Sequence, residues 1–284
     1  MTETTSEAEA RAALEAAGQL PEAELDLASV ALQFARIDAP EANWGAAAQH
    51  LSELARAAVT AAAKDREADA GNGLRRAAVL RTVVQDRFGY AGDSETYEAP
   101  ENANLIHVIE RRRGLPVALG ILWLHAAEAA GWSAWGLDFP GHFLLGIEGS
   151  RGAAVIDPFQ PARPLDAPEL RAILKRVQGA QAELRPEFLA PVSKRAVLLR
   201  LQNNIKLRRL GTGNLQGALA CTQDMLRLAP DVAALWREAA LMNQRLDRIG
   251  AALACLERFL ALVPEGEAAQ RARAMAAELR QRLH

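Results

Sequence analysis

Residues 217–230 and 251–264 of this 284-residue chain have similar sequences at an offset of 34 residues, GALACTQDMLRLAP and AALACLERFLALVP. Cys221 matches Cys255, both segments carry apolar residues at helical spacing, and both end in proline. A period of this length predicts helix pairs that stack on one another, because a single pair cannot bury its apolar face alone. The C-terminal third is therefore expected to be an all-helical array.

The 34-residue period that ends in proline is the signature of the tetratricopeptide repeat. We expect two repeats, over residues 197–230 and 231–264, and a capping helix over residues 266–283, all within a region from 195 to 284. Two repeats bury too little apolar surface to be stable alone. We therefore expect them to pack on the last helix and on the preceding domain.

Composition and charge exclude several classes of protein. Half of the residues are hydrophobic, 24% are charged and the formal net charge is −2, which argues against a nucleic-acid partner. The two cysteines, Cys221 and Cys255, are too few for a disulfide framework and fit a reducing cytosol. Their equivalent places in the repeats favour a packing role over a redox role.

The chain shows no membrane or export signal. The N-terminal residues are acidic and lack the basic and apolar regions of a signal peptide. The longest apolar stretch, residues 114–132, contains His125 and Glu128 and is too short to span a bilayer. We therefore expect a cytoplasmic protein with no membrane association.

Residues 25–190 are expected to form an α+β domain, preceded by a flexible segment over residues 1–24. Helical periodicity covers the first half of this domain. Pro116 opens the most apolar helix of the chain, which Gly131 ends, and a helix apolar nearly all round is usually buried. Short apolar runs then predict antiparallel strands over residues 133–139, 142–148 and 153–159.

His142 and Asp157 are the candidate catalytic residues. If the last two runs form a hairpin, the two side chains lie on adjacent strands within hydrogen-bond reach, about 2.6–3.2 Å. A histidine held by an aspartate is two thirds of a nucleophilic catalytic set. The alternatives are a strand-end histidine satisfied by hydrogen bonds and a turn aspartate before Pro158.

The third member of such a set is missing. In cysteine enzymes of the papain and transglutaminase type, a thiol lies at the start of a central buried helix, where the helix dipole and a histidine favour the thiolate. The corresponding stretch, RRGLPVALGI over residues 112–121, contains no Cys, Ser or Thr. The thiol position falls between Pro116 and Ala118, and the three residues there are chemically inert.

Three motifs resemble the SirB-type transglutaminase-like family: NLIHVIERRRGLPVALGILWLHAAEAAG, FPGHFLL and IDPF. The resemblance runs from about residue 30 to residue 280 and implies a transglutaminase-like, papain-like fold followed by tetratricopeptide repeats. It places His142 and Asp157 on the family's histidine and aspartate. The family's cysteine has no counterpart in this sequence.

Other residues are expected around the same cleft. Glu110 and Arg113 precede the central helix, although the basic run Arg111–Arg113 fits a solvated helix end better. We name as candidate cleft residues Glu110, Arg113, Pro116, Val117 and Trp135. No histidine has a trustworthy metal-ligand spacing with another ligand residue, so we expect neither a metal nor a cofactor.

Three functions remain open on the sequence. The favoured one is a non-catalytic transglutaminase-like protein that binds a protein partner through its repeats, which expose surfaces suited to peptides. The second is a hydrolase in which His142 and Asp157 activate water. The third is a pocket that binds a small ligand or a modified protein in the former active-site cleft. The sequence identifies no substrate and no partner.

Overall fold

The computed structural model describes residues 5–160 and 163–282. The chain divides into two compact units. The first unit contains residues 21–201 together with residues 5–7, and the second contains residues 8–20 and those from 202 onward. The first unit carries the α+β domain and the second carries the repeats.

Helices form the first half of the first unit, as the periodicity predicts. They are α2 (Leu27–Asp38), α3 (Trp44–Ala62), α4 (Arg66–Asp69), α5 (Gly73–Arg81) and α6 (Leu105–Arg111), with short 3-10 turns at Glu22–Glu24 and Pro100–Ala103 and a π-helical turn at Thr82–Arg87. Side chains placed before the first turn accept hydrogen bonds from its free N–H groups and so fix where these helices begin. The capping residues of α2, α3, α4, α5 and α6 are Asp26, Asn43, Asp65, Asn72 and Asn104.

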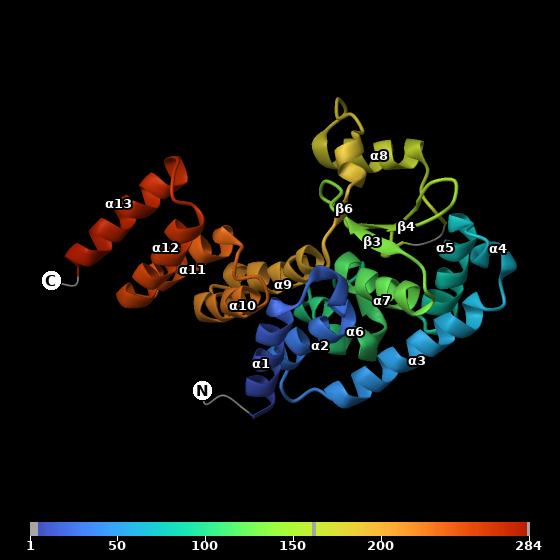
Figure 1. The fold of residues 1–284 in the computed structure, drawn as a ribbon, viewed down its shortest axis with the longest axis horizontal. Helices are drawn as coiled ribbons and strands as arrows, with labels where there is room; N and C mark the ends of the chain where they lie inside the picture. The colour runs from blue at the N-terminus through green and yellow to red at the C-terminus, as the bar shows by residue number, and fades with distance from the viewer. Residues whose placement is uncertain (1–4, 161–162, 283–284) are drawn as a thin grey trace. The chain divides into compact units, whose positions relative to one another are not determined.

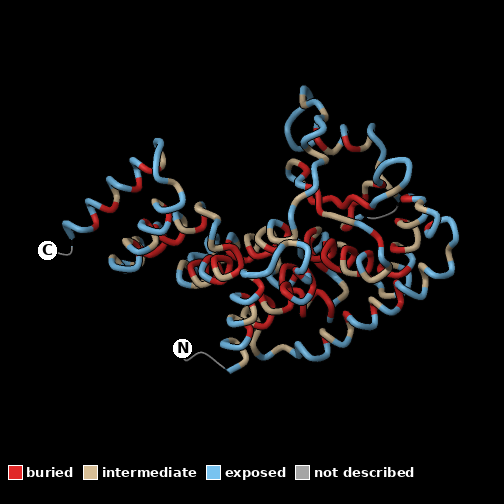
Figure 2. Tube along the Cα trace, in the orientation of Figure 1, coloured by how far each residue is buried: buried red, intermediate tan, exposed pale blue. Residues whose placement is uncertain are grey.

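The central helix α7 (Pro116–Ala129) is the buried core of this unit. Proline occupies its first turn, ten of its residues from Val117 to Ala127 are buried, and Gly131 follows it with a φ of 75°. Helices α2 and α3 pack against it. Figure 2 shows the buried residues gathered where α7 lies between the other helices and the sheet.

A four-stranded antiparallel sheet lies against α7, in the order β5-β4-β3-β6. Its strands are β3 (Ala134–Leu137), β4 (Leu144–Ile147), β5 (Ala154–Ile156) and β6 (Pro191–Val192). Helix α8 (Ala167–Gln178) covers the opposite face, where Leu170 and Leu174 pack with Leu137, Phe139 and Leu144. The sheet therefore lies between α7 and α8 (Figure 1). A 3-10 turn at Pro186–Leu189 leads into β6.

A second, two-stranded parallel sheet borders the start of α7. Strand β1 (Ala91–Gly92) pairs with β2 (Arg113–Gly114), with Ala91 opposite Arg113 and Gly92 opposite Gly114. Because β2 leads directly through Leu115 into α7, this pairing fixes the position at which the central helix begins.

The second unit is all-helical, as the 34-residue period predicts. It contains α9 (Lys194–Gly211, from Gln202), α10 (Leu215–Leu228), α11 (Ala233–Arg245), α12 (Ile249–Leu262) and α13 (Glu267–Gln281). Helices α10 and α12 begin and end 34 residues apart. Consecutive helices α10 to α13 contact one another, and Leu256, Phe259 and Leu279 lie in a shared core. The expected fold class, α+β followed by helical repeats, is confirmed.

The N-terminal segment differs from our expectation of a flexible segment over residues 1–24. Residues 5–19 form helix α1 (Thr5–Gln19), in which Ala10, Leu14 and Ala17 are buried at helical spacing. The sequence there is rich in Ala and Glu, which are good helix formers. An ion pair with the repeats fixes the helix, since Arg11 Nε lies 3.0 Å from Asp224 Oδ1 of α10.

Candidate functional site

His142 and Asp157 lie at neighbouring strand ends. Strands β4 and β5 are antiparallel, with Leu145 opposite Ile156, so the start of β4 is next to the end of β5. His142 is two residues before β4, and Asp157 directly follows β5. We expected both residues within the strands; both lie just outside them, because one turn ends at His142 and another begins at Asp157.

The turn that carries His142 follows from its sequence. Pro140 and Gly141 occupy the central positions, a pair favoured in type II turns because the second residue needs a positive φ. Gly141 has a φ of 63°, and the His142 N–H donates to the Phe139 carbonyl at 3.0 Å. A side chain on Gly141 would also meet Val177 of α8 at 2.4 Å. The histidine is therefore held by a turn in which another residue would be strained.

The two side chains form the predicted pair. His142 Nε2 lies 2.8 Å from Asp157 Oδ2, with 27% of the His142 side chain and 11% of the Asp157 side chain exposed. The other carboxylate oxygen, Oδ1, accepts from the Phe159 N–H at 2.8 Å. Asp157 is thus both a turn residue and the partner of His142. Among the described residues, the second ring nitrogen of His142, Nδ1, has no hydrogen-bond partner.

Packing connects this pair to the start of α7. Phe143, which follows His142, lies so close to Gly120 of α7 that a Cβ there would be 2.4 Å from the phenylalanine ring. Beyond Asp157, the Phe159 carbonyl accepts from the Gly92 N–H of β1 at 3.3 Å. Since β1 pairs with β2, and β2 leads into α7, both sides of the His142–Asp157 pair are attached near the first turn of the central helix.

The residues at that first turn carry no nucleophile. Val117 and Ala118 are 2% and 0% exposed, and Pro116 is half-buried. The two cysteines belong to the second unit, where Cys221 is buried on α10 and Cys255 is half-buried on α12. Burial raises the pKa of the Cys255 thiol, which disfavours its reactive thiolate.

Two residues of the basic run, Arg111 and Arg113, are exposed as expected for a solvated helix end, but the run also makes specific contacts. Arg111 donates to Asp93 Oδ2 and to Asn102 Oδ1, each at 3.0 Å. Hydrogen bonds from Thr96, together with those from Asn102 and Arg111, lower the pKa of the Asp93 carboxyl. Sequence reasoning missed Asp93 and Asn102. The signal available was the turn-forming GDSET stretch, in which an aspartate side chain bonds back to the chain.

Arg112 is half-buried and also makes specific contacts. It has a φ of 59°, and its guanidinium contacts Tyr90 Oη at 2.5 Å and the ring of His50. Burial raises the pKa of the Tyr90 hydroxyl, and the charge and hydrogen bond of Arg112 offset part of this rise. Burial and the nearby Arg112 cation both lower the pKa of His50. Through these contacts, Arg111 and Arg112 stabilise the chain around β1 and β2, next to the start of α7.

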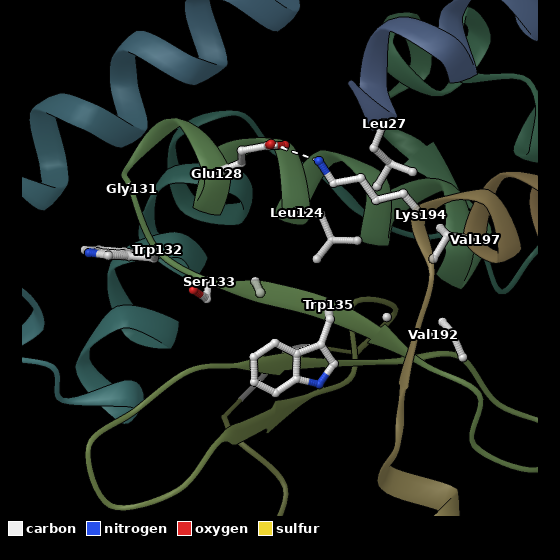
Figure 3. A pocket seen from close by; sticks show the side chains of 12 residues that line it. Leu27, Leu124, Glu128, Gly131, Trp132, Ser133, Trp135, Val192, Lys194 and Val197 are labelled. Atoms are coloured by element: carbon white, nitrogen blue, oxygen red, sulfur yellow. Dashed lines mark hydrogen bonds and ion pairs between the residues drawn. The ribbon is translucent and has the colours of Figure 1, made fainter. Parts of the chain in front are cut away.

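The predicted cleft residues do not form one group. Glu110 is exposed and contacts His107 at 3.1 Å, and Arg113 is exposed and donates to the Gly89 carbonyl at 3.1 Å. Pro116 and Val117 form the first turn of α7. Trp135 lines a cavity of about 410 Å³, but neither His142 nor Asp157 lines that cavity. Figure 3 shows this cavity, beside the C-terminal half of α7.

Within the described residues, no three His, Cys, Asp or Glu side chains are grouped so that they could hold a metal ion. No helix in the described parts of the chain is both long and apolar enough to cross a membrane.

Comparison with known proteins gives two family matches. The model of the transglutaminase-like superfamily matches residues 45–203, and a tetratricopeptide repeat model matches residues 205–277. The first match covers the α+β domain from α3 onward and extends into α9, and the second covers helices α10 to α12 and most of α13. No solved structure matches the chain.

Relatives named UPF0162 protein are similar to this chain. The one from Pseudomonas aeruginosa is 30% identical over 237 residues, which cover 84% of this chain and 83% of that protein. The one from Vibrio cholerae is 30% identical over 78% of this chain and 80% of that protein. The one from Xylella fastidiosa (strain Temecula1) is 34% identical over 171 residues, and this match spans 60% of that relative's length.

Proposed function

This chain belongs to the transglutaminase-like superfamily and to its SirB-type UPF0162 branch, and we propose that it is a non-catalytic member that acts as a protein-interaction or ligand-binding module. One observation carries the proposal. The His142–Asp157 pair is formed at 2.8 Å and attached near the start of α7, while that start reads Gly-Leu-Pro-Val-Ala. A thiolate is the attacking species in this fold class, and a proline, a valine and an alanine cannot supply one.

The cysteines elsewhere do not replace it. Cys221 and Cys255 sit at equivalent repeat positions, inside packed helices of the second unit. The pKa of Cys255 is raised, opposite to the direction that a nucleophilic thiol requires. These features support a packing role for both cysteines.

The repeats supply the interaction surface in this proposal. Helical repeats stack into curved arrays whose surfaces suit peptide segments. On the described helices α9, α11 and α12, several leucines are exposed beyond a third of their surface: Leu207, Leu210, Leu241 and Leu262. Exposed apolar side chains that gather in one contiguous patch mark protein-binding surfaces. The proposed partner is a protein that buries these leucines.

A second function is favoured by one specific observation. The Asp157 carboxylate holds His142 through Nε2, and Nδ1 has no partner among the described residues. A histidine oriented in this way can accept a proton from water. A hydrolase that activates water directly would need this pair and no thiol.

Turnover assays separate the two functions. The wild type and His142→Ala are incubated with ester and peptide substrates and with glutamine-containing proteins plus amine donors. The non-catalytic proposal expects no turnover above the protein-free rate from either protein. Turnover that resists thiol alkylation and is lost in His142→Ala would instead establish the hydrolase. His125→Ala is the matched control, because His125 lies away from the pair and its Nε2–H donates to the Leu51 carbonyl of α3.

A further inference from the structure

The cavity beside α7 has the size and the apolar lining of a small-ligand site. Its volume of about 410 Å³ is within the range of known small-ligand pockets, about 300–1,000 Å³. Its walls come from α2, α7, β3, β6, α9 and the loop after α7, and they are mainly aliphatic and aromatic: Leu27, Leu124, Trp132, Trp135, Val192 and Val197. Figure 3 shows Leu27, Leu124 and Val197 converging on the space between α7 and the segment that leads into α9.

One side of the cavity is an unpaired strand edge. The Glu148 N–H donates to the Ser133 carbonyl at 2.9 Å, so Ser133, Trp135 and Leu137 direct their backbone groups towards β4. By the same alternation, Ala134 and Gly136 direct theirs to the other edge of β3. Gly136 meets Val192 of β6 there, but β6 ends at Val192. Among the described residues, the N–H and C=O of Ala134 therefore have no strand partner on that edge.

The rim carries one lysine and one glutamate, Lys194 and Glu128, which form an ion pair. Lys194 Nζ donates to the Leu25 carbonyl at 2.8 Å and to Glu128 Oε1 at 2.9 Å, and its side chain is 29% exposed. Glu128 is 57% exposed, and within the described residues Lys194 is the one partner of its carboxylate. The lysine is thus anchored to the backbone, whereas the glutamate can rotate into solvent. A ligand carboxylate can take its place.

We propose that this cavity binds the carboxyl-terminal residues of an extended polypeptide. The backbone of the bound segment pairs with the free N–H and C=O of Ala134 and adds a short strand to β3. An apolar side chain of the segment enters the space between Leu124 and Val197. The terminal carboxylate binds Lys194 Nζ in place of Glu128, as a charge-assisted hydrogen bond.

The geometry favours a chain end over an internal segment. At Gly136 the edge of β3 is already paired with Val192 of β6, so β6 and the following Lys194 block an added strand from continuing past Gly136. The added strand must therefore stop beside Lys194. The unpaired backbone groups of Ala134 favour a polypeptide over a simple fatty acid, which offers them no amide.

Fluorescence anisotropy with the full chain tests the proposal. The probe is a fluorescein-labelled hexapeptide that ends in leucine, in a free-acid form and in an amidated form. We expect saturable binding of the free acid and at least about tenfold weaker binding of the amide, since hydrogen bonds to charged groups are strong. Lys194→Met should weaken the free acid by a similar factor. Lys175→Met, at an exposed lysine of α8, should leave binding unchanged.

A backbone variant keeps the test independent of the lysine. Ala134→Pro removes the edge-facing N–H without removing a hydrogen bond to β4, and we expect binding about fivefold weaker with an unchanged melting temperature. Equal affinity for the acid and the amide would overturn the proposal, as would the absence of saturable binding. Hexanoate bound as tightly as the peptide, with no effect of Ala134→Pro, would identify a small-acid site and overturn it too.

Discussion

Helix α1 is fixed to the repeats by a mostly buried ion pair, and removing the arginine tests that attachment. Arg11 Nε lies 3.0 Å from Asp224 Oδ1, and 23% of the arginine and 7% of the aspartate side chain are exposed. Burial raises the pKa of Asp224, and the Arg11 and Arg227 cations offset only part of this rise. In Arg11→Leu, the buried carboxylate loses one of these two cations.

The magnitude follows from what remains around the carboxylate. Removing one partner of a fully buried pair costs about 3–5 kcal/mol, because a charge stays buried and uncompensated. Here Arg227 Nε remains 3.3 Å from the same oxygen. We therefore expect Arg11→Leu to lower the free energy of unfolding by about 1–3 kcal/mol at pH 8.

The loss should depend on pH with a definite sign. Without Arg11, the folded-state pKa of Asp224 rises further above its unfolded value, so the folded state binds the proton more readily. The penalty is present above that raised pKa and disappears as the pH falls through it towards the unfolded pKa. The loss should therefore be smaller at pH 5 than at pH 8.

Urea unfolding followed by far-ultraviolet circular dichroism measures both effects on the full chain. The double variant Arg11→Leu/Asp224→Leu is the matched control, because replacing both charges by apolar groups should recover most of the stability. A loss in Arg11→Leu below about 0.5 kcal/mol at pH 8, the range of ordinary surface substitutions, would refute the reasoning. So would a double variant as unstable as the single one.

Three further outcomes are expected. Gly120→Ala should lower the unfolding free energy by about 1–3 kcal/mol, because its Cβ would lie 2.4 Å from the Phe143 ring. The control Gly250→Ala has open space around the new Cβ and should stabilise its helix by up to about 1 kcal/mol. Chemical denaturation measures both changes. Burial lowers the pKa of His50, so the unfolded state binds a proton more readily, and wild-type stability should fall as the pH drops below about 6.5. His50→Gln should reduce that fall, as measured by melting curves at pH 7.5 and 5.5. The fragment of residues 195–284, which lacks α1, should melt well below the full chain; a cooperative transition at the full-chain temperature would contradict this.

The elements with a strong local pattern were predictable from the sequence. The 34-residue period gave the lengths and spacing of α10 and α12, because each repeat is a unit whose packing depends on its neighbours. The apolar run after Pro116 gave the buried helix α7. The His142–Asp157 pair followed from two short strands joined by a glycine-containing turn, which determines which ends meet.

The features that the sequence did not reveal depend on distant partners. Helix α1 has an ordinary alanine-rich sequence, and its attachment requires Asp224, more than 200 residues away. The arginines at 111 and 112 look like a solvated run until β1 places Asp93 and Tyr90 beside them. The cavity beside Trp135 arises where β6 ends after two residues, which no periodicity marks.

Thiol-dependent turnover by the wild type is the most direct test of the missing nucleophile. Amine incorporation into a glutamine-containing protein is measured with and without prior alkylation, for the wild type, for Cys221→Ser/Cys255→Ser and for Val117→Cys, which places a thiol at the start of α7. The non-catalytic proposal predicts no alkylation-sensitive turnover by the wild type. Alkylation-sensitive turnover by the wild type that disappears in Cys221→Ser/Cys255→Ser would contradict it.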